Sequence, residues 1–529
     1  MNRRIHFAIL HLVAAVLLST HAHAITCPID STPPSDGDVA LARKDYKQAE
    51  VAFRSELATN AQSETARLGL VRALIGENDV AQAHDQAATM LTEHPKDALA
   101  EVAVGEAAYR AANFVETQQH AHAAMSDDPC EGRAFAIMAL LESTYSYYAL
   151  SAQHLSTAHK LRPKDELIRR AWIRTLSRKL RKEELSHYLD DGQNNLSADD
   201  RTGYLNSLNH LNASRPGECR ITSKAETTRI PLTPLVEGTY LKSYGLEVAF
   251  DSKKRRMQID TGASGITLTA SAAKRLGIAP EYHAHTGGIG DQGEVQSFLT
   301  HVANIQIGDI QVSDCMVEVI QTSRLDVDGL IGLDVFSKWL VTLDYQKTEL
   351  RLAPLPPRPK IATPGTVSDS DDDEGKPHDR YIAPEMQDWL KVIRIGHNLL
   401  IPASVNLKST DPHYMIMDTG SSMTTLSVAF AKEGGKLSSS DITFKGISGN
   451  VKKAYSSSEI PLYFGSFRLP PATFPAFDIT NISHDIGFEV SGLVGLPTLS
   501  RLSMEIDYRD NLVHLTYDPK KDQQRFRYQ

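Results

Sequence analysis

The stretch MQIDTGASGITLT, from Met257 to Thr269, returns later in the chain as MIMDTGSSMTTLS, from Met415 to Ser427. Each copy places Asp-Thr-Gly after a short apolar run, and small and hydroxylated residues follow it. A single Asp-Thr-Gly could be an ordinary turn between strands. A second pair of matching segments, at 328–352 and 491–515, lies at a similar distance beyond each copy. The chain therefore contains a duplicated unit, and this duplication predicts its fold.

The sequence around both copies has the character of short strands. Segments such as GLEVAF and WLVTLDYQKTELRL alternate or run apolar, with turns rich in Gly and Asp between them. The same character returns in NLLIPASV and LSMEIDYRDNLVHLTY. We therefore expect two copies of one β domain, lobe one at 229–356 and lobe two at 386–518.

The motifs of both lobes follow one order. Asp-Thr-Gly-Ala/Ser-Ser is followed about 70 residues later by two apolar residues and Gly, at Leu330-Ile331-Gly332 and at Leu493-Val494-Gly495. This order resembles the aspartic proteases of the retropepsin and pepsin clan. In that clan each lobe brings one catalytic Asp on a turn, and the later strand passes beside that turn, where Gly avoids a clash. The resemblance implies a catalytic pair of Asp260 and Asp418.

The chemistry explains why two copies are needed. A single exposed aspartate has a pKa near 4, so it is ionised at neutral pH and cannot act as an acid. Two carboxylates held about 3 Å apart cannot both ionise, so they share one proton. The ionised member accepts a proton from a bound water, and the protonated member polarises the scissile carbonyl. Asp260 and Asp418 are expected to form this pair within one chain.

The remaining residues of the motif have supporting roles. Gly residues tighten each turn and bring backbone N–H groups toward the carboxylates, and the threonines resemble those that hydrogen-bond across the lobe interface in the clan. A hydroxyl that donates to a carboxylate favours its charged form. Ser421, whose counterpart is Ala263, is therefore predicted to make Asp418 the more readily ionised member. The supporting set is Thr261, Gly262, Ser264, Gly332, Thr419, Gly420, Ser421 and Gly495.

Two glycine-rich segments between the motifs resemble the flaps of the retropepsins. They are HTGGIGDQGEV (285–295) and KGISGNV (445–451), and the predicted substrate-binding residues are Gly288, Ile289, Gly290, Gly446, Ile447 and Gly449. The pepsin flap tyrosine has no clear equivalent, since Tyr282 precedes the glycine-rich stretch. His283 and His285 could bind a metal, but surface histidines are the better interpretation. We expect no metal and no cofactor.

The N-terminal third has a different pattern, with a period of 34 residues. Three sets of positions keep this step: Tyr46, Val80, Phe114 and Tyr148; the small residues Ala49, Ala83, Thr117 and Ser151; and Pro95, Pro129 and Pro163. Period and closing prolines resemble tetratricopeptide repeats, in which each unit is a pair of helices. The alternative is a helical bundle without repeats. We predict repeats over 38–185, serving as a spacer or as a surface for a protein partner.

Two segments are predicted to join the modules. Residues 186–228 are polar and rich in turn-forming residues, which is typical of a connector. Residues 357–385 are rich in Pro and then acidic, which is typical of a flexible, solvated linker that lets the lobes face each other. Calcium binding by the acidic run is an alternative, but the spaced ligands and turn Gly of a calcium loop are missing.

The N-terminus predicts export. Arg3 and Arg4 precede an apolar stretch, and Ala22-His23-Ala24 supplies a small-x-small cleavage site, so residues 1–24 resemble a signal peptide. A membrane anchor is the alternative, although about 14 apolar residues are short for a spanning helix. We expect a periplasmic or secreted protein that has no membrane segment after cleavage. The net charge of −9 offers no footprint for nucleic acid.

Four cysteines are spread along the chain, at 27, 130, 219 and 315, and none forms a CxxC pair. A zinc site is therefore disfavoured. An exported protein could join them as disulfides in three connectivities, and Cys130 with Cys27 or with Cys219 is conceivable. Isolated buried thiols are an equally good interpretation, and the sequence does not choose.

These features together predict a multidomain protein: an all-α helical-repeat module followed by a bilobal, all-β aspartic-protease fold with two retropepsin-like lobes. The predicted function is an exported aspartic endopeptidase that cleaves a polypeptide substrate. One alternative is an inactive scaffold that keeps the protease fold to bind peptides. Another is a catalytic pair formed between two molecules.

Overall fold

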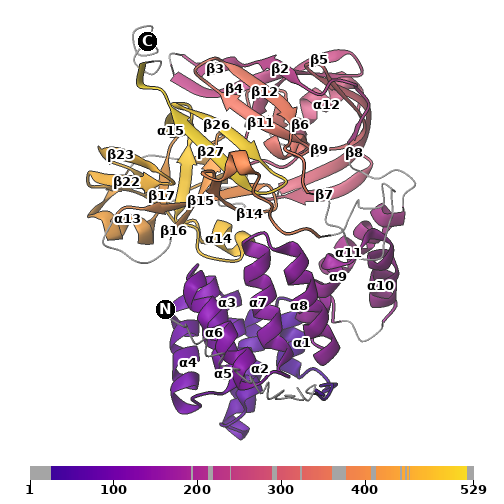
Figure 1. Ribbon diagram of the computed structural model, residues 1–529, viewed down its shortest axis with the longest axis vertical. Helices are drawn as coiled ribbons and strands as arrows, with labels where there is room; N and C mark the ends of the chain where they lie inside the picture. Colours follow the sequence, from indigo (N-terminus) through magenta and orange to yellow (C-terminus); the bar gives the residue numbers. More distant parts are fainter. Residues whose placement is uncertain are drawn as a thin grey trace, which may run out of the picture.

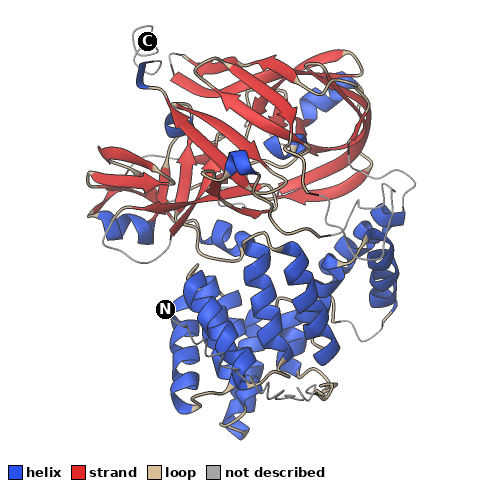
Figure 2. Ribbon diagram, in the orientation of Figure 1, coloured by secondary structure: helices blue, strands red, loops and turns tan. Residues whose placement is uncertain are grey.

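The computed structural model describes residues 26–191, 195–212, 219–238, 240–288, 295–321, 325–359, 377–406, 413–440, 444–446, 449–451 and 453–520. The predicted signal peptide, 1–24, lies outside them. None of the helices in these segments combines the length and the apolar character needed to cross a membrane. A helical module and a β region lie against each other (Figure 1), and the boundary between helix and strand is sharp (Figure 2).

The helical module consists of antiparallel helix pairs and confirms the predicted repeats. Its helices are α1 (Asp36–Ala42), α2 (Tyr46–Thr59), α3 (Glu64–Gly76), α4 (Val80–Glu93), α5 (Ala98–Arg110), α6 (Phe114–Asp127), α7 (Gly132–Thr144), α8 (Tyr148–Leu161), α9 (Glu166–Thr175), α10 (Arg178–Asp190) and α11 (Ala198–Asn212). The first residues of α2, α4, α6 and α8 are the positions that recur every 34 residues. The sequence period is therefore the period of the helix pairs.

The turn inside each helix pair has the same backbone shape. Lys44, Asn78, Ala112 and Ser146 stand two residues before the second helix and have φ values of 61°, 63°, 62° and 67°. The small residue four positions into that helix is buried in every repeat, with at most 3% exposure. A larger side chain there would separate the helices. Each closing proline stands two residues beyond the end of α4, α6 or α8, where it cannot interrupt a helical hydrogen bond.

Lobe one is built on a nine-stranded sheet. Its elements are β1 (Arg220–Ile221), β3 (Thr233–Glu237), β4 (Tyr240–Phe250), β5 (Lys253–Ile259), β6 (Ile266–Thr269), α12 (Ala270–Leu276), β7 (Tyr282–Thr286), β8 (Val295–Ile307), β9 (Ile310–Ile320), β10 (Gly329–Ile331) and the 3-10 helix η1 (Leu333–Phe336). The strand order is β1-β9-β6-β10-β5-β4-β8-β7, with β3 beside β4. Strand β10 thus lies between β5 and β6, the two strands that flank the first Asp-Thr-Gly.

Lobe two repeats this arrangement in a ten-stranded sheet. Its elements are β14 (Ile393–Ile395), β15 (Asn398–Ser404), β16 (His413–Asp418), β17 (Thr425–Ser427), α13 (Val428–Gly434), β18 (Leu437–Ser440), β19 (Lys445–Gly446), β20 (Gly449–Asn450), β21 (Ala454–Ser457), β22 (Ile460–Phe464), β23 (Phe467–Ala472), β24 (Pro475–Phe477), α14 (Thr480–Ile486), β25 (Gly492–Gly495) and α15 (Leu496–Leu499). Strand β25 lies between β16 and β17, as β10 does in lobe one, and β19 pairs with β20 apart from the main sheet.

A six-stranded sheet joins the lobes. It contains β2 (Thr228–Pro231), β11 (Trp339–Asp344), β12 (Glu349–Pro354), β13 (Leu390–Lys391), β26 (Leu502–Asp507) and β27 (Leu512–Tyr517), in the order β13-β27-β26-β11-β12-β2. At its centre Thr342 pairs with Glu505, the residue at the equivalent position of lobe two. On either side of this pair, Val341 pairs with Ile506 and Leu343 pairs with Met504. The pairing is symmetric, so a local two-fold axis runs between the duplicated strands. One hydrophobic core extends through both lobes and this sheet.

The helical repeats are packed against lobe two. Phe114 of α6 lies edge-on to Phe488, with ring centroids 5.0 Å apart, and both rings are buried in one cluster with Tyr109. Arg110, whose side chain is 4% exposed, pairs with Glu489 at 2.8 Å. Aromatic packing and an ion pair whose arginine is buried hold the two modules together.

Two predicted joints differ from the structure. The connector at 186–228 was predicted from polar and turn-forming residues, but it contains the end of α10 (Arg178–Asp190), α11, β1 and the first residue of β2. The C-terminal part of the linker at 357–385 is packed rather than solvated: Asp379 accepts hydrogen bonds from the N–H groups of Ala149 and Leu150, and Ala383 is buried. Pairing with backbone donors and apolar burial overcome the polar composition there. Residues 360–376, which include the acidic run, lie outside the described residues.

The cysteines form two disulfides, Cys27–Cys130 and Cys219–Cys315. The first joins the N-terminal segment to the start of α7, and the second ties the segment before β1 to β9. The interpretation of the cysteines as isolated thiols is therefore wrong, and so is a bond between Cys130 and Cys219.

Candidate active site

The two Asp-Thr-Gly turns stand at equivalent places in their sheets. Asp260 follows the end of β5, and its N–H donates to Ile331 O of β10 at 3.0 Å. In lobe two, Asp418 ends β16 and is in parallel register with Gly495 of β25. The inserted strand therefore fixes where each carboxylate leaves the sheet. The lobe interface brings Asp260 and Asp418 together within one chain.

The two carboxyl groups are hydrogen-bonded to each other. Each also accepts a bond from its own turn: Gly262 N–H reaches Asp260 Oδ1 at 2.8 Å, and Gly420 N–H reaches Asp418 Oδ1 at 2.9 Å. Asp418 accepts a further bond from Ser421 N–H at 3.1 Å. Lobe two thus gives its carboxylate one additional donor.

The surroundings raise the pKa of both acids, although Gly420 N–H also favours the charged form of Asp260. Burial and the charge of Asp418 raise the pKa of Asp260 well above its ordinary value. Burial also raises the pKa of Asp418, but the N–H donors of Gly420 and Ser421 and the hydrogen bond from Asp260 oppose that rise. Both acids therefore bind a proton more readily than a free aspartate does, and they titrate as a coupled pair.

The predicted reason for an order of ionisation between the two acids was wrong. The hydroxyl of Ser421 donates to Met423 O at 2.8 Å, not to Asp418, and only the backbone N–H of Ser421 serves the carboxylate. A side-chain hydroxyl can donate either to a carboxylate or to a backbone carbonyl, and here it donates to a carbonyl in its own loop. The expected order of ionisation loses the reason given for it and stays a prediction.

The glycines of both motifs stand where no side chain fits. A β-carbon built on Gly420 would lie 2.2 Å from Asp260 Oδ2, whereas one on Gly262 would lie 3.0 Å from Asp418 Oδ1. On the inserted strands, a β-carbon on Gly332 would lie 2.4 Å from Ala263 O, and one on Gly495 would lie 2.2 Å from Met423 O. Glycine is required for the close approach of turn and strand.

The two threonines hydrogen-bond across the lobe interface. Thr261 Oγ1 donates to Met417 O at 2.6 Å and accepts from Thr419 N–H at 2.9 Å. Thr419 Oγ1 accepts from Thr261 N–H at 3.1 Å and lies 3.4 Å from Ile259 O. Both side chains are buried, so each lobe positions the Asp-Thr-Gly turn of the other.

Three residues near the pair were not singled out from the sequence. Asp334 of η1 accepts hydrogen bonds from Gly265 N–H at 3.0 Å and from Ser264 Oγ at 3.2 Å. Ser264, predicted as a supporting residue, therefore contacts Asp334. His397, in the β14–β15 turn of lobe two, donates from Nε2 to Gly262 O at 2.9 Å. Burial lowers the pKa of His397. No local pattern marks this histidine, because its contact is with the other lobe.

Tyr345 is the third of these residues, and a signal for it was present. It is fully buried near Thr419, and burial raises its pKa. Asp-Tyr occurs at the same place in both copies, at 344–345 and 507–508. The repeated tyrosine could have been recognised as part of the support beneath the turns.

The flap residues are described only in part. Gly288 is exposed at the end of the segment that follows β7, and Gly446 pairs with Gly449 in the β19–β20 hairpin. Ile289, Gly290 and Ile447 lie outside the described residues. On β7, the ring of His283 packs against Phe298 at 4.9 Å between centroids. Within the described segments, no group of three His, Cys, Asp or Glu side chains is arranged to hold a metal.

Comparison with known families agrees with this architecture. Residues 246–338 match the family described as gag-polyprotein putative aspartyl protease, a range that includes the turn at Asp260 and the strand at Gly332. Residues 40–104 match the tetratricopeptide repeat family. No curated protein matches the chain. The chain therefore combines tetratricopeptide repeats with a gag-like aspartyl protease domain, whose topology lobe two repeats.

Proposed function

We propose that this protein is an exported aspartic endopeptidase that hydrolyses peptide bonds with water activated between Asp260 and Asp418. The observation that carries the proposal is the hydrogen-bonded pair of carboxyl groups at the lobe interface, each held by the N–H groups of its own turn. The two disulfides support export, because such bonds persist in oxidising compartments.

The asymmetry of the pair assigns the roles. Ionised Asp418 accepts a proton from the attacking water, while protonated Asp260 donates a hydrogen bond to the scissile carbonyl and so polarises it. The two N–H donors at Asp418 stabilise its charge before the reaction. The water attacks directly, so no covalent bond forms between substrate and enzyme. The repeats, packed on lobe two, hold or position the polypeptide.

The test is cleavage of an unfolded protein such as casein from about pH 3 to about pH 8. Asp260→Asn and Asp418→Asn should each abolish cleavage, and a pepstatin-type inhibitor should block the wild type. Cleavage that survives either substitution would refute the pair. If no pH gives cleavage while both variants fold like the wild type, the inactive peptide-binding scaffold becomes the better account.

A further inference from the structure

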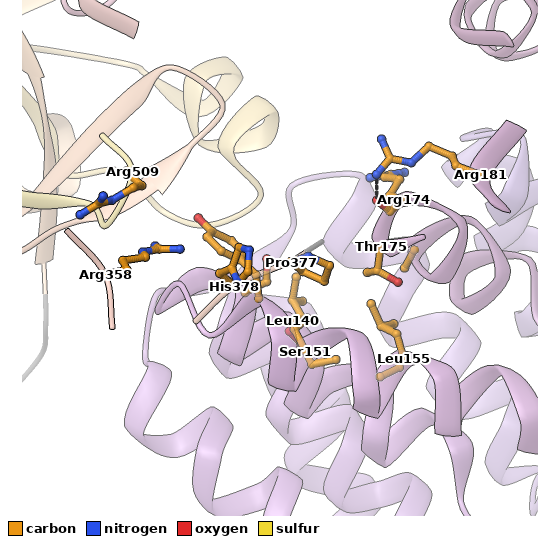
Figure 3. A pocket seen from close by; sticks show the side chains of 15 residues that line it. Leu140, Ser151, Leu155, Arg174, Thr175, Arg181, Arg358, Pro377, His378 and Arg509 are labelled. Atoms are coloured by element: carbon orange, nitrogen blue, oxygen red, sulfur yellow. Dashed lines mark hydrogen bonds between the residues drawn. The ribbon is translucent and has the colours of Figure 1, made fainter. Parts of the chain in front are cut away.

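A cavity lies away from the catalytic pair, where the repeats, the linker ends and the central sheet meet. It has a volume of about 590 Å³ (Figure 3). Helices α7 and α8 supply its apolar floor, including Ala139, Leu140 and Leu155. We call it the junction pocket. Because three modules contribute to it, it exists only in the assembled chain.

The walls of the junction pocket carry positive charge. Arg174 and Arg181 lie on the repeat side, while Arg358, His378 and Arg509 lie on the side of the linker and the β26–β27 turn (Figure 3). None of its described lining residues carries a carboxylate. The lining is therefore complementary to an anionic group.

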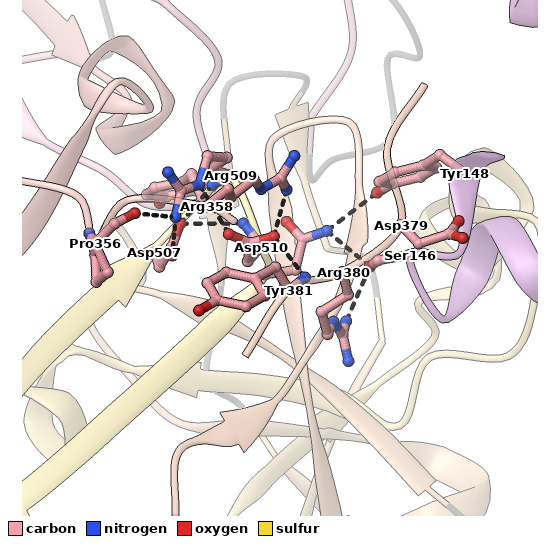
Figure 4. Close-up of polar contacts among 12 residues, drawn as sticks. Ser146, Tyr148, Pro356, Arg358, Asp379, Arg380, Tyr381, Asp507, Arg509 and Asp510 are labelled. Carbon is pink, nitrogen blue, oxygen red and sulfur yellow. Dashed lines mark hydrogen bonds and ion pairs between the residues drawn. The ribbon is translucent and has the colours of Figure 1, made fainter. Parts of the chain in front are cut away.

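The two sides of the pocket differ in how far this charge is neutralised. Arg358 and Arg509 both pair with the buried carboxylate of Asp510, in the network of Figure 4. Arg181 instead donates to the backbone carbonyls of Arg174 and Leu176, and its Nε is buried without a hydrogen-bond partner among the described residues. The exposed side chain of Arg174 stands beside it. The unneutralised charge lies on the repeat side, directly above the apolar floor.

The floor indicates what kind of anion fits. Leu140 lines the pocket and is 44% exposed, so an aliphatic side chain bound there could cover it. Cations over an apolar floor suit a segment that alternates carboxylates with aliphatic side chains. A polyphosphate or nucleic acid would leave the floor uncovered. The inner groove of the repeats is less available, because Asp30 of the N-terminal segment is bound there to Arg162 at 2.6 Å.

We propose that the junction pocket binds an extended, acidic segment of a separate polypeptide that also carries aliphatic residues. This assigns a place and a chemistry to the partner role of the repeats. Only the role of that polypeptide, as substrate or as adaptor, rests on the proposed function. The test measures binding alone, so its failure leaves cleavage at the pair untouched.

The probe is a fluorescein-labelled peptide of about 12 residues made of Asp, Glu, Leu and Ala, titrated with the mature full chain bearing Asp418→Asn. Arg174→Glu should weaken binding roughly five- to tenfold at about 25 mM salt, and less at about 150 mM. Lys179→Glu is the matched control: it reverses an exposed charge on α10 outside the lining and should change affinity less than about twofold. Leu140→Ser should weaken binding about tenfold at either salt concentration.

Several results would overturn the proposal. One is equal weakening by Arg174→Glu and Lys179→Glu, which would mean general electrostatic attraction. Another is displacement of the peptide by inorganic tripolyphosphate at equal charge concentration with no effect of Leu140→Ser, which would mean a simple anion site. A third is tighter binding after residues 371–374 are replaced by alanine, because the acidic run of the chain itself would then be the occupant.

Discussion

Thr261→Val tests the interdependence of the two lobes. The substitution keeps the size and β-branching of the side chain and removes its hydroxyl. The lost hydroxyl donates to Met417 O and accepts from Thr419 N–H, and both partners are buried in the lobe interface. Each buried group left unpaired costs about 1–3 kcal/mol, so the expected loss is about 2–6 kcal/mol. That is a large part of the roughly 5–15 kcal/mol by which a domain is stable.

The equivalent change in lobe two should cost less. Thr419 Oγ1 accepts from Thr261 N–H at 3.1 Å, but its contact with Ile259 O is 3.4 Å, too long for a strong hydrogen bond. Thr419→Val is therefore expected to lose about 1–3 kcal/mol. Sequence symmetry alone predicts equal effects, so the order of the two losses tests the geometry.

The assay is urea unfolding followed by tryptophan fluorescence in a Trp172→Phe background. The remaining tryptophans, Trp339 and Trp389, lie in or beside the central sheet that joins the lobes. Thr261→Ser is the control, because it restores the hydroxyl without the methyl group. A loss below about 0.5 kcal/mol for Thr261→Val, or a larger loss for Thr419→Val, would refute the reasoning.

The other predictions concern the pair and the module interface. Gly420→Ala should reduce kcat far more than Gly262→Ala. The new β-carbon at 420 would lie 2.2 Å from Asp260 Oδ2, whereas the one at 262 would lie 3.0 Å from the carboxyl of Asp418. Equal rates of the two variants would contradict this prediction. The raised pKa of Asp260 means that the folded chain binds its proton more tightly, so stability falls as pH rises from the ordinary Asp range through that pKa. Asp260→Asn should therefore gain stability relative to the wild type as the pH rises from about 4 to about 7. The gain should be about 1.4 kcal/mol for every tenfold by which folding strengthens proton binding at Asp260. A difference in melting temperature that does not change with pH would count against this prediction. Ser421→Ala should leave the acidic limb of the pH–rate profile in place, because the hydroxyl does not contact Asp418; a moved limb would favour a hydroxyl that donates to the carboxylate after all. Phe488→Ala should cost about 3–5 kcal/mol and split the calorimetric transition into two as the repeats separate from lobe two, whereas a single unchanged transition would show that the interface contributes little.

Much of the fold could be predicted from the sequence because its information is local or periodic. The 34-residue step predicted the helix pairs, since each repeat must present the same small residue to its neighbour. The duplicated Asp-Thr-Gly and the later glycine predicted the turn and the inserted strand through their resemblance to the clan, in which Gly permits that approach. The joints were harder to predict, because polar composition does not reveal that Asp379 finds backbone donors on α8.

What the sequence by itself determined is the presence of two equivalent halves, each with one Asp-Thr-Gly turn. Only the tertiary structure decided how the halves differ. The hydroxyl of Ser421 donates to a carbonyl of its own loop, and His397 donates to the Asp-Thr-Gly turn of the other lobe. The four cysteines form the disulfides Cys27–Cys130 and Cys219–Cys315. The same holds for the packing of the repeats on lobe two and for the junction pocket. Each of these depends on distances between residues remote in the chain, and packing sets those distances after the local patterns are satisfied.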